Sequence, residues 1–326
     1  MKVIQAKSAG FCFGVQRAVE LAEQTARERG GCVMLGSIIH NAHVVQHLEQ
    51  LGAHQVAGPE AIRPGDTVLI RAHGEKKQVI GHLKDIGAEC VDATCPNVLR
   101  VQQIVAQADA EGRVPIIIGD PNHPEVMGVA SWSARSVVFE GAETLQRWLD
   151  EDPARRELPL TAVAQTTCIR IIWDGAAEIL KKQCTNAKIF DTICNATHKR
   201  QSEAAELASQ VDVMVVVGDR KSANTKHLTE ICSRQCPAVY QIERAEELKR
   251  DFLTGCSVAG LTAGASTPAG IIKEVYTTMS EEIKTMEPTE ESFEEMLEKS
   301  FKTLNTGEKV TGIVTAVGPT EVQVDL

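Results

Sequence analysis

The sequence predicts an α/β protein that contains more than one parallel sheet. Short runs rich in valine, isoleucine and alanine alternate with longer segments of helical periodicity, from the N-terminus to about residue 280. Strands and helices that alternate in this way form parallel sheets. Polar residues gather wherever a predicted strand stops, and ligands of such sheets bind outside the carboxyl ends of the strands. We therefore expect several small α/β units that face one cavity.

The predicted strands of the first half each lead into a loop with one reactive or polar side chain. The strands cover residues 3–6, 32–36, 68–72, 88–91 and 116–118, and the loops contain Cys12, His40, His73, Cys95 and His123. Helical segments follow the loops. The first has apolar Val15, Ala18 and Ala22 at helical spacing and ends at Gly30, and the second runs from about residue 42 to residue 51.

The second half continues the same pattern. Its predicted strands cover residues 161–164, 212–217 and 256–261, and the loops after them contain Thr166, the pair Ser222 and Asn224, and Ser266. Because these loops also follow the carboxyl ends of strands, they are expected to border the same cavity.

The bulk composition indicates a globular protein. The chain has 326 residues, of which 43% are hydrophobic, enough for two or three domains with packed cores. The first residues lack the apolar stretch of a secretory signal, and no apolar run approaches the roughly 18 residues of a membrane span. We therefore expect a cytoplasmic protein, without a membrane partner, whose ten cysteines are reduced thiols or metal ligands. The net charge of −10 argues against a sequence-independent nucleic-acid surface but permits a small anionic substrate.

Three cysteines share one local setting. Cys95 and Cys194 each follow an acidic residue by three positions at the end of an apolar run, and Cys12 lies between a predicted strand and a helix. At such a position the backbone N–H groups and the helix dipole favour the thiolate, which is the form that binds metals. The three lie too far apart in the sequence to match a short zinc or ferredoxin motif. We nevertheless expect the thiols to meet and hold a metal cluster; the alternative is that each is a small buried apolar side chain.

The polar residues at the strand ends are of types that bind phosphate. Neutral imidazole, hydroxyl and amide groups can donate hydrogen bonds to phosphate oxygens. The candidates are His40, His73, His123, Ser222, Asn224 and Ser266. Glu125 follows His123 closely, and a carboxyl group there could relay protons. The sequence contains no G-x-G-x-x-G, P-loop or G-x-S-x-G motif, so dinucleotide, nucleotide and serine-hydrolase functions lack support.

The composition changes after about residue 279. Residues 281–298 hold eight glutamates and one basic residue, Lys284, and apolar residues at helical spacing predict one amphipathic helix in an acidic linker. Residues 309–314 and 322–326 flank a Gly318-Pro319 turn and predict a β-hairpin. A lone hairpin is marginal in water, so we interpret it as the first piece of an unfinished barrel.

Together these motifs resemble one family, 4-hydroxy-3-methylbut-2-enyl diphosphate reductase, also called IspH or LytB. The resemblance covers residues 1 to about 280, with all matches in the same order. The matching stretches are Gly10-Phe11-Cys12-Phe13-Gly14-Val15, His40-Asn41, Ala72-His73-Gly74, Asp92-Ala93-Thr94-Cys95-Pro96, His123-Pro124-Glu125-Val126, Gln165-Thr166-Thr167, Cys194-Asn195-Ala196-Thr197, Ser222-Ala223-Asn224 and Thr262-Ala263-Gly264-Ala265-Ser266-Thr267-Pro268.

The resemblance implies three similar α/β units around a central iron–sulfur site. Its cluster ligands fall on Cys12, Cys95 and Cys194, which leaves one iron of a 4Fe-4S cluster without a protein ligand. The implied units are 1–96, 97–193 and 194–284, with the N-terminal strand as a candidate partner for the third, followed by an acidic helical linker at 285–305 and a hairpin at 306–326. The hairpin resembles the start of the OB-fold RNA-binding repeat of a ribosomal protein, and RNA would be a partner only if full repeats were present.

The implied reaction removes the hydroxyl of 4-hydroxy-3-methylbut-2-enyl diphosphate and gives isopentenyl and dimethylallyl diphosphate in the non-mevalonate isoprenoid pathway. The six phosphate-binding candidates would hold the diphosphate, Glu125 and Thr166 would position and deliver the proton, and a ferredoxin or flavodoxin would supply electrons. Ala223 departs from the family pattern, in which many relatives have a second serine, and so lacks one hydroxyl donor. Asp120 replaces a common histidine, and Ala269-Gly270 replace an acid-plus-aromatic pair.

Two functions of other classes remain as alternatives. The same three thiols could hold zinc in a structural or redox-sensing protein, which would contain zinc and neither iron nor sulfide. The terminal hairpin could belong to an RNA-binding protein in which the reductase-like part is a scaffold. Metal analysis and RNA binding, respectively, would distinguish these from a reductase.

Overall fold

The fold class is α/β, as the sequence predicts. The computed structural model describes residues 2–286, 313–317 and 322–325. The chain forms two compact units, residues 1–284 and 285–326. The larger unit contains three four-stranded sheets in which every strand pair is parallel. Within the described residues, no helix is both apolar enough and long enough to cross a membrane.

The first sheet has the strand order β3-β2-β4-β5. Its strands are β2 (Cys32–Leu35), β3 (Ala53–Val56), β4 (Thr67–Ile70) and β5 (Glu89–Asp92). The helices of this part are α1 (Phe13–Arg29), α2 (Ala42–Gln50) and α3 (Lys77–Asp85), with a short 3₁₀ turn η1 (Pro59–Ala61). The apolar faces of α1 and α2 pack against β2 and β4 around Met34, Leu48 and Leu69, which are fully buried.

The second sheet has the equivalent order, β7-β6-β8-β9. Its strands are β6 (Val114–Ile118), β7 (Val137–Phe139), β8 (Leu160–Ala164) and β9 (Ala187–Ile189). The helices are α4 (Pro96–Ala110), α5 (Pro124–Ala130), α6 (Ala142–Glu151) and α7 (Arg170–Gln183), with the 3₁₀ turn η2 (Pro153–Glu157). Every residue of β8 is buried, as expected for a central parallel strand with helices on both faces.

The third sheet takes its fourth strand from the other end of the chain. Its order is β1-β12-β10-β11, with β1 (Lys2–Gln5), β10 (Val213–Val217), β11 (Ala238–Ile242) and β12 (Val258–Ala263). Lys2 lies opposite Val258 and Gln5 opposite Leu261. The helices are α8 (Asn195–Ala208), α9 (Ala223–Ser233) and α10 (Ala269–Met286), with the 3₁₀ turns η3 (Ala245–Glu247) and η4 (Arg250–Phe252). N-terminal β1 therefore occupies the place that β5 and β9 take in the other sheets.

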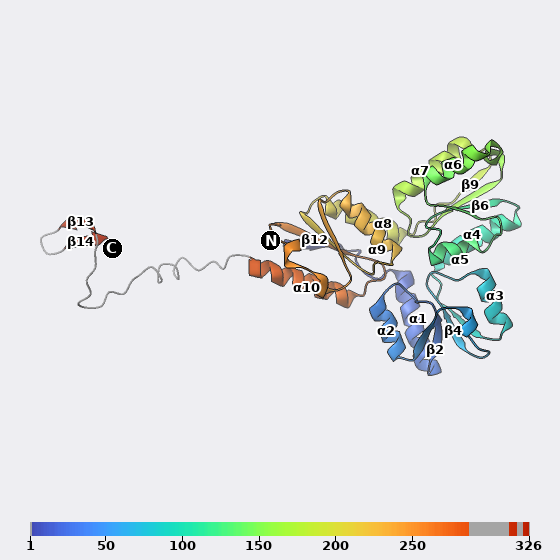
Figure 1. Ribbon diagram of the computed structural model, residues 1–326, viewed down its shortest axis with the longest axis horizontal. Helices are drawn as coiled ribbons and strands as arrows, with labels where there is room; N and C mark the ends of the chain where they lie inside the picture. The colour runs from blue at the N-terminus through green and yellow to red at the C-terminus, as the bar shows by residue number, and fades with distance from the viewer. Residues whose placement is uncertain (1, 287–312, 318–321, 326) are drawn as a thin grey trace. The chain divides into compact units, whose positions relative to one another are not determined.

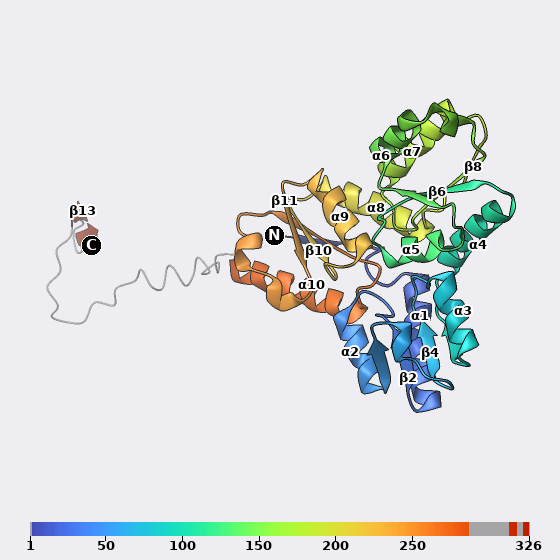
Figure 2. The same cartoon turned by 45° about the vertical axis from the view of Figure 1, so that its right-hand side comes forward.

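The three sheets and their helices surround a common centre (Figures 1 and 2). In each sheet, the edge strand that neighbours β4, β8 or β12 is followed in the chain by a helix that packs with another sheet. Strand β5 is followed by α4, β9 by α8, and β1 by α1. The connections between units therefore pass through the centre, and they are the segments that carry the three cysteines.

Four observed strands, β3, β7, β9 and β11, have no counterpart among the strand ranges predicted from the sequence. Each lies at the outer edge of its sheet. In β3 only Ala53 is buried, and β7 has three residues, so neither gives the apolar alternation or run by which a strand is recognised. The predicted terminal hairpin is present as antiparallel β13 (Ile313–Val317) and β14 (Val322–Asp325). Most of the predicted acidic linker at 285–305 lies outside the described residues, because only the end of α10 is described there.

Candidate functional site

One cavity, of about 90 Å³, contains every site residue predicted from the sequence. The predicted residues that line it are Cys12, His40, His73, Cys95, His123, Glu125, Thr166, Cys194, Ser222, Asn224 and Ser266. They come from all three sheets, and each follows the carboxyl end of a parallel strand. The expectation of α/β units that face one cavity is therefore confirmed.

The repeated strand order explains why these residues meet. The equivalent strands β2, β6 and β10 are followed by loops that carry His40, His123, and Ser222 with Asn224. The equivalent strands β4, β8 and β12 are followed by loops that carry His73, Thr166 and Ser266. The equivalent edge strands β5, β9 and β1 are followed by loops that carry Cys95, Cys194 and Cys12. Corresponding strands of the three sheets therefore supply corresponding positions around the cavity.

The cysteine loops are tied to the cavity by one repeated hydrogen bond. The backbone N–H of Cys95 donates to Ala72 O at 3.0 Å, that of Cys194 to Thr166 O at 3.0 Å, and that of Cys12 to Ala265 O at 3.3 Å. The three acceptors lie in the loops that follow β4, β8 and β12. All three cysteines are the N-cap residues of α4, α8 and α1, and none of these three side chains caps its own helix. The thiols are therefore not used as helix caps and can bind a metal.

The surroundings of Cys95 fit a metal centre with several thiolates. Burial raises the pKa of the Cys95 thiol; the backbone N–H groups of Asn97 and Val98 oppose this, and the neighbouring Cys12 and Cys194 add to it. Three adjacent thiolates repel one another, and bound metal cations offset this electrostatic repulsion. The Asn97 side chain donates to Cys194 Sγ at 3.1 Å. A sulfur donor set of this kind suits zinc or an iron–sulfur cluster.

Gly14 allows α1 to approach the Cys95 thiol. A Cβ atom on Gly14 would lie 2.4 Å from Cys95 Sγ, far inside contact distance. We expect Gly14→Ala to displace this thiol and reduce bound metal, measured as iron and zinc per chain. Gly81→Ala is the matched control, because Gly81 also lies in a helix but its Cβ would meet no atom within 4 Å. That control should gain roughly 1 kcal/mol of helix stability. Equal metal content in the two variants would contradict this role for Gly14.

Arg200 fastens the Cys12 loop to α8, and the sequence prediction did not include it. Its Nε donates to Ser8 O at 3.0 Å and one terminal nitrogen donates to Gly10 O at 2.7 Å. The side chain lines the cavity and is 3% exposed, and its Nη1 has no partner among the described residues. A signal was available: Arg200 lies on the same helical face as the small, buried Thr197 and Ala204, where an arginine is unusual.

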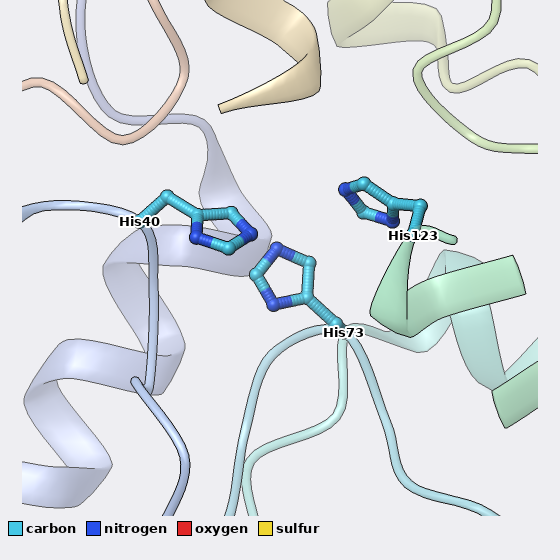
Figure 3. A group of neighbouring side chains, drawn as sticks. All are labelled: His40, His73 and His123. Atoms are coloured by element: carbon cyan, nitrogen blue, oxygen red, sulfur yellow. The ribbon is translucent and has the colours of Figure 1, made fainter. Parts of the chain in front are cut away.

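The three histidines point toward one another from three loops (Figure 3). Their ring centroids are 4.7 Å apart for His40 and His73, 5.4 Å for His73 and His123, and 6.0 Å for His40 and His123. His123 Nδ1 accepts a hydrogen bond from the Glu125 backbone N–H at 3.2 Å, so the neutral ring carries its proton on Nε2. The ligand nitrogens of the three rings lie within 4.8 Å of one another, a spacing that suits either a shared anion or a metal ion.

The histidines are held in the neutral form. Burial lowers the pKa of His40, lowers that of His73 well below its usual value, and lowers that of His123 to about 4. The neighbouring imidazoles add to the effect at His73 and His123, and the Arg71 guanidinium adds to it at all three. Arg71 is fixed by an ion pair with Glu75 at 2.8 Å, and it brings positive charge close to the rings.

Acid should destabilise the protein through these rings. Unfolded His123 titrates near 6.5 and the folded residue near 4, so the unfolded chain binds more protons between these values and stability falls as the pH drops through this window. The loss for His123 alone is on the order of 3 kcal/mol. We expect the thermal midpoint of His123→Gln to depend less steeply on pH over this range, with His54→Gln, an exposed ring, as the control. An unchanged pH slope in His123→Gln would contradict the assignment.

Glu125 and Thr166 form a closed pair at the cavity wall. The Thr166 backbone N–H donates to Glu125 Oε1 at 2.6 Å and the Thr166 hydroxyl to Oε2 at 2.8 Å. Both side chains are buried, and burial raises the pKa of Glu125 despite these two hydrogen bonds. A carboxyl group whose pKa is raised in this way, next to a cavity, can act as a general acid.

Several polar atoms of the cavity have no partner. Among the described residues, the buried atoms without a hydrogen bond include His40 Nε2, His73 Nδ1, both side-chain polar atoms of Asn224, and Ser266 Oγ. Burial of an unpaired polar group costs free energy, so such groups are rare unless a ligand pairs them. Their residues all line this cavity, which indicates a site for a polar ligand.

Of the residues that depart from the family pattern, only Ala223 lines the cavity. Ala223 lines the cavity as the first residue of α9, so a hydroxyl is missing from the wall itself. Asp120 is exposed and is not among the lining residues; its carboxylate accepts from the Asn122 backbone N–H at 2.8 Å. Gly270 lines a separate pocket beside Pro268.

A profile of the family described as LytB protein matches residues 3–280. The chain belongs to the LytB family. Among the relatives of this LytB chain is a 4-hydroxy-3-methylbut-2-enyl diphosphate reductase from Caldanaerobacter subterraneus subsp. tengcongensis, 39% identical over 90% of the chain and 100% of the relative. A protein of the same name from Clostridium perfringens is 40% identical over 86% of the chain and 98% of the relative.

Solved structures agree with this membership. The LytB chain is similar to a structure of (E)-4-hydroxy-3-methyl-but-2-enyl diphosphate reductase, with 38% identity and a TM-score of 0.62 over 86% of the chain and 100% of that structure. It is also similar to the E-1-hydroxy-2-methyl-but-2-enyl-4-diphosphate reductase from Plasmodium falciparum, with 26% identity and a TM-score of 0.80 over 85% of the chain and 87% of that structure. The family profile ends before the terminal hairpin.

Proposed function

We propose that this protein reduces 4-hydroxy-3-methylbut-2-enyl diphosphate to isopentenyl and dimethylallyl diphosphate, the reaction named for its relatives. The observation that carries the proposal is the group of unpaired polar atoms in the cavity that the three thiols also border. A diphosphate offers many acceptor oxygens, and the neutral histidines, the Asn224 amide and the Ser266 hydroxyl offer the matching donors.

The donor set fits an iron–sulfur cluster held by Cys12, Cys95 and Cys194, and we propose a 4Fe-4S cluster with one iron that has no protein ligand. Three thiols from three separate loops border the cavity. When bound, the cluster would pass single electrons to the substrate and act as a Lewis acid toward its hydroxyl. We propose a ferredoxin or flavodoxin as the electron donor, as the resemblance to the reductase family implies.

The remaining chemistry belongs to the chain's own residues. His40, His73, His123, Ser222, Asn224 and Ser266 would bind the diphosphate and fix the position of its allylic end. Glu125, protonated and oriented by Thr166, would donate a proton to the departing hydroxyl. We propose that this carboxyl group, and not bulk water, delivers the proton. In total the substrate takes up two electrons and two protons and releases one water.

Anaerobic reconstitution with iron and sulfide tests the proposal. The loaded protein should be brown, should oxidise reduced methyl viologen only when the diphosphate substrate is present, and should yield the two isomeric diphosphates by mass spectrometry. A colourless protein with one zinc and no iron would instead support the zinc alternative.

The unit boundaries at 96/97 and 193/194 are part of this proposal. They place Cys95, which follows β5, just before the first boundary, and Cys194, which follows β9, directly after the second. For the C-terminal segment we propose no RNA-binding role, since the structure describes two of the five strands of an OB-fold barrel there.

A further inference from the structure

A second pocket reaches the same three thiols. It has a volume of about 290 Å³ and shares Cys12, Cys95 and Cys194 with the cavity. None of the histidines that line the cavity borders it, nor does Glu125. A group bound by the three thiols would therefore be approached from two directions, one lined by the substrate-binding residues and one not.

The second pocket is built from the first turns of three helices. Phe13 of α1, Asn97 and Arg100 of α4, and Asn195 of α8 line it. The N-terminus of a helix carries a partial positive charge, and here three of them converge on one pocket. Phe13 is 75% exposed, a large value for an aromatic side chain.

Each of these helices carries a cation five residues after its cysteine. The cations are Arg17, Arg100 and Lys199. Residues four apart lie on the same face of a helix, so Arg17 lies one turn beyond Phe13, and Lys199 one turn beyond Asn195. Arg100 lines the pocket itself. We call Arg17, Arg100 and Lys199 the cation ring.

The cation ring has little opposing charge. Arg100 and Lys199 are exposed, and neither forms an ion pair among the described residues. Arg17 donates to the carbonyl oxygens of Thr94 and Asp92 at 3.3 and 3.4 Å.

The acids near the ring are already engaged. Asp191 pairs with Arg170 at 2.6 Å, the carboxylate of Asp92 accepts from the Thr94 N–H, and Glu203, close to Lys199, accepts from Lys7 N and Ser8 N. Asp92 and Glu203 keep their negative charge, so the three cations of the ring outnumber the two nearby carboxylates that form no ion pair among the described residues. The face therefore has a small excess of positive charge in a chain whose net charge is −10.

We propose that the cation ring and Phe13 form the docking face for a small acidic protein that carries one electron at a time. This inference rests on the proposed function, because the reaction consumes two electrons at the site of the thiols. Two carriers would each donate one electron in turn and leave oxidised, while the protons enter from the side of Glu125. Complementary charge speeds such encounters, and an exposed aromatic side chain gives a transient interface its apolar centre.

The test compares two reductants of the anaerobically loaded enzyme. Arg100→Glu/Lys199→Glu reverses two members of the ring and leaves Arg17 in place, because its bonds support the Cys95 loop. With a reduced, purified acidic ferredoxin we expect the KM for the carrier to rise at least about tenfold and its dependence on salt to weaken. With reduced methyl viologen, which needs no docking face, the turnover rate should not fall.

Two further variants make the result decisive. Lys84→Glu/Arg147→Glu makes the same change of charge at exposed positions of α3 and α6 and should leave the KM for ferredoxin unchanged. Arg100→Gln/Lys199→Gln removes the charge without reversing it and should give an intermediate KM even if the reversed variant folds poorly. An unchanged KM for ferredoxin in both ring variants would overturn the docking face but leave the reductase intact. A loaded native enzyme that is inactive with both reductants would instead overturn the proposed function.

Discussion

Replacement of Cys95 by serine is expected to abolish bound iron and reductase activity together. Cys95 is the N-cap of α4, lines both pockets, and is influenced electrostatically by Cys12 and Cys194. Serine keeps the size and the backbone hydrogen bond to Ala72 O but lacks the soft thiolate that iron requires. The loss of metal affinity should exceed the about 10- to 100-fold effect of changes outside the ligand set.

Iron and sulfide content, visible absorbance and methyl viologen oxidation measure this outcome. Cys184→Ser is the matched control, because Cys184 is a half-buried cysteine at the end of α7 that borders neither pocket with the three thiols. It should retain full iron. If Cys95→Ser kept its iron and its turnover, the three-thiol site would be wrong.

Substitution of Glu125 by glutamine is expected to separate chemistry from assembly. The amide retains an oxygen for the Thr166 N–H but has no carboxyl proton to donate, and Glu125 is 2% exposed, so no other side chain can easily take its place. The iron content should be normal, and turnover should fall by about 10²- to 10⁴-fold, the usual range for loss of a general acid. The KM for the diphosphate should change little.

Steady-state kinetics with reduced methyl viologen and a count of iron per chain distinguish these effects. Thr166→Ser, which preserves the hydroxyl donor to Glu125, serves as the conservative partner and should retain most of the activity. Normal turnover in Glu125→Gln would show that the proton comes from elsewhere.

The position of the candidate residues at one cavity could be predicted from sequence because most of them follow a recognisable strand. Cys194, which follows the short strand β9, is an exception. The central strands β6, β8 and β10 are almost wholly buried, so they read as apolar runs, and the loops after them carry His123, Thr166 and Ser222. A parallel sheet places such loops on one edge whatever the order of its strands. Residues that line the cavity could therefore be named without knowledge of the topology.

Other features depend on contacts between distant segments, which local patterns do not encode. Arg200 acquires its role from the carbonyl oxygens of Ser8 and Gly10, which lie 192 and 190 residues away in the sequence. Arg71 reads as an ordinary residue at the end of β4, and its influence on the three histidines appears only when the loops are assembled. The edge strand β3 is too exposed, and β7 is too short, to leave a recognisable pattern.

The pairing of β1 with β12 has a consequence for the order of events during synthesis. Residues 2–5 leave the ribosome first, but their partner strand spans Val258–Ala263, so the third sheet lacks its fourth strand until that segment has emerged. Closing so long a loop is slow compared with local pairing. Cys12, the earliest thiol to be made, is thus the last to reach its place. The machinery that delivers iron and sulfide should therefore encounter chains on which nearly the whole LytB region has already been translated.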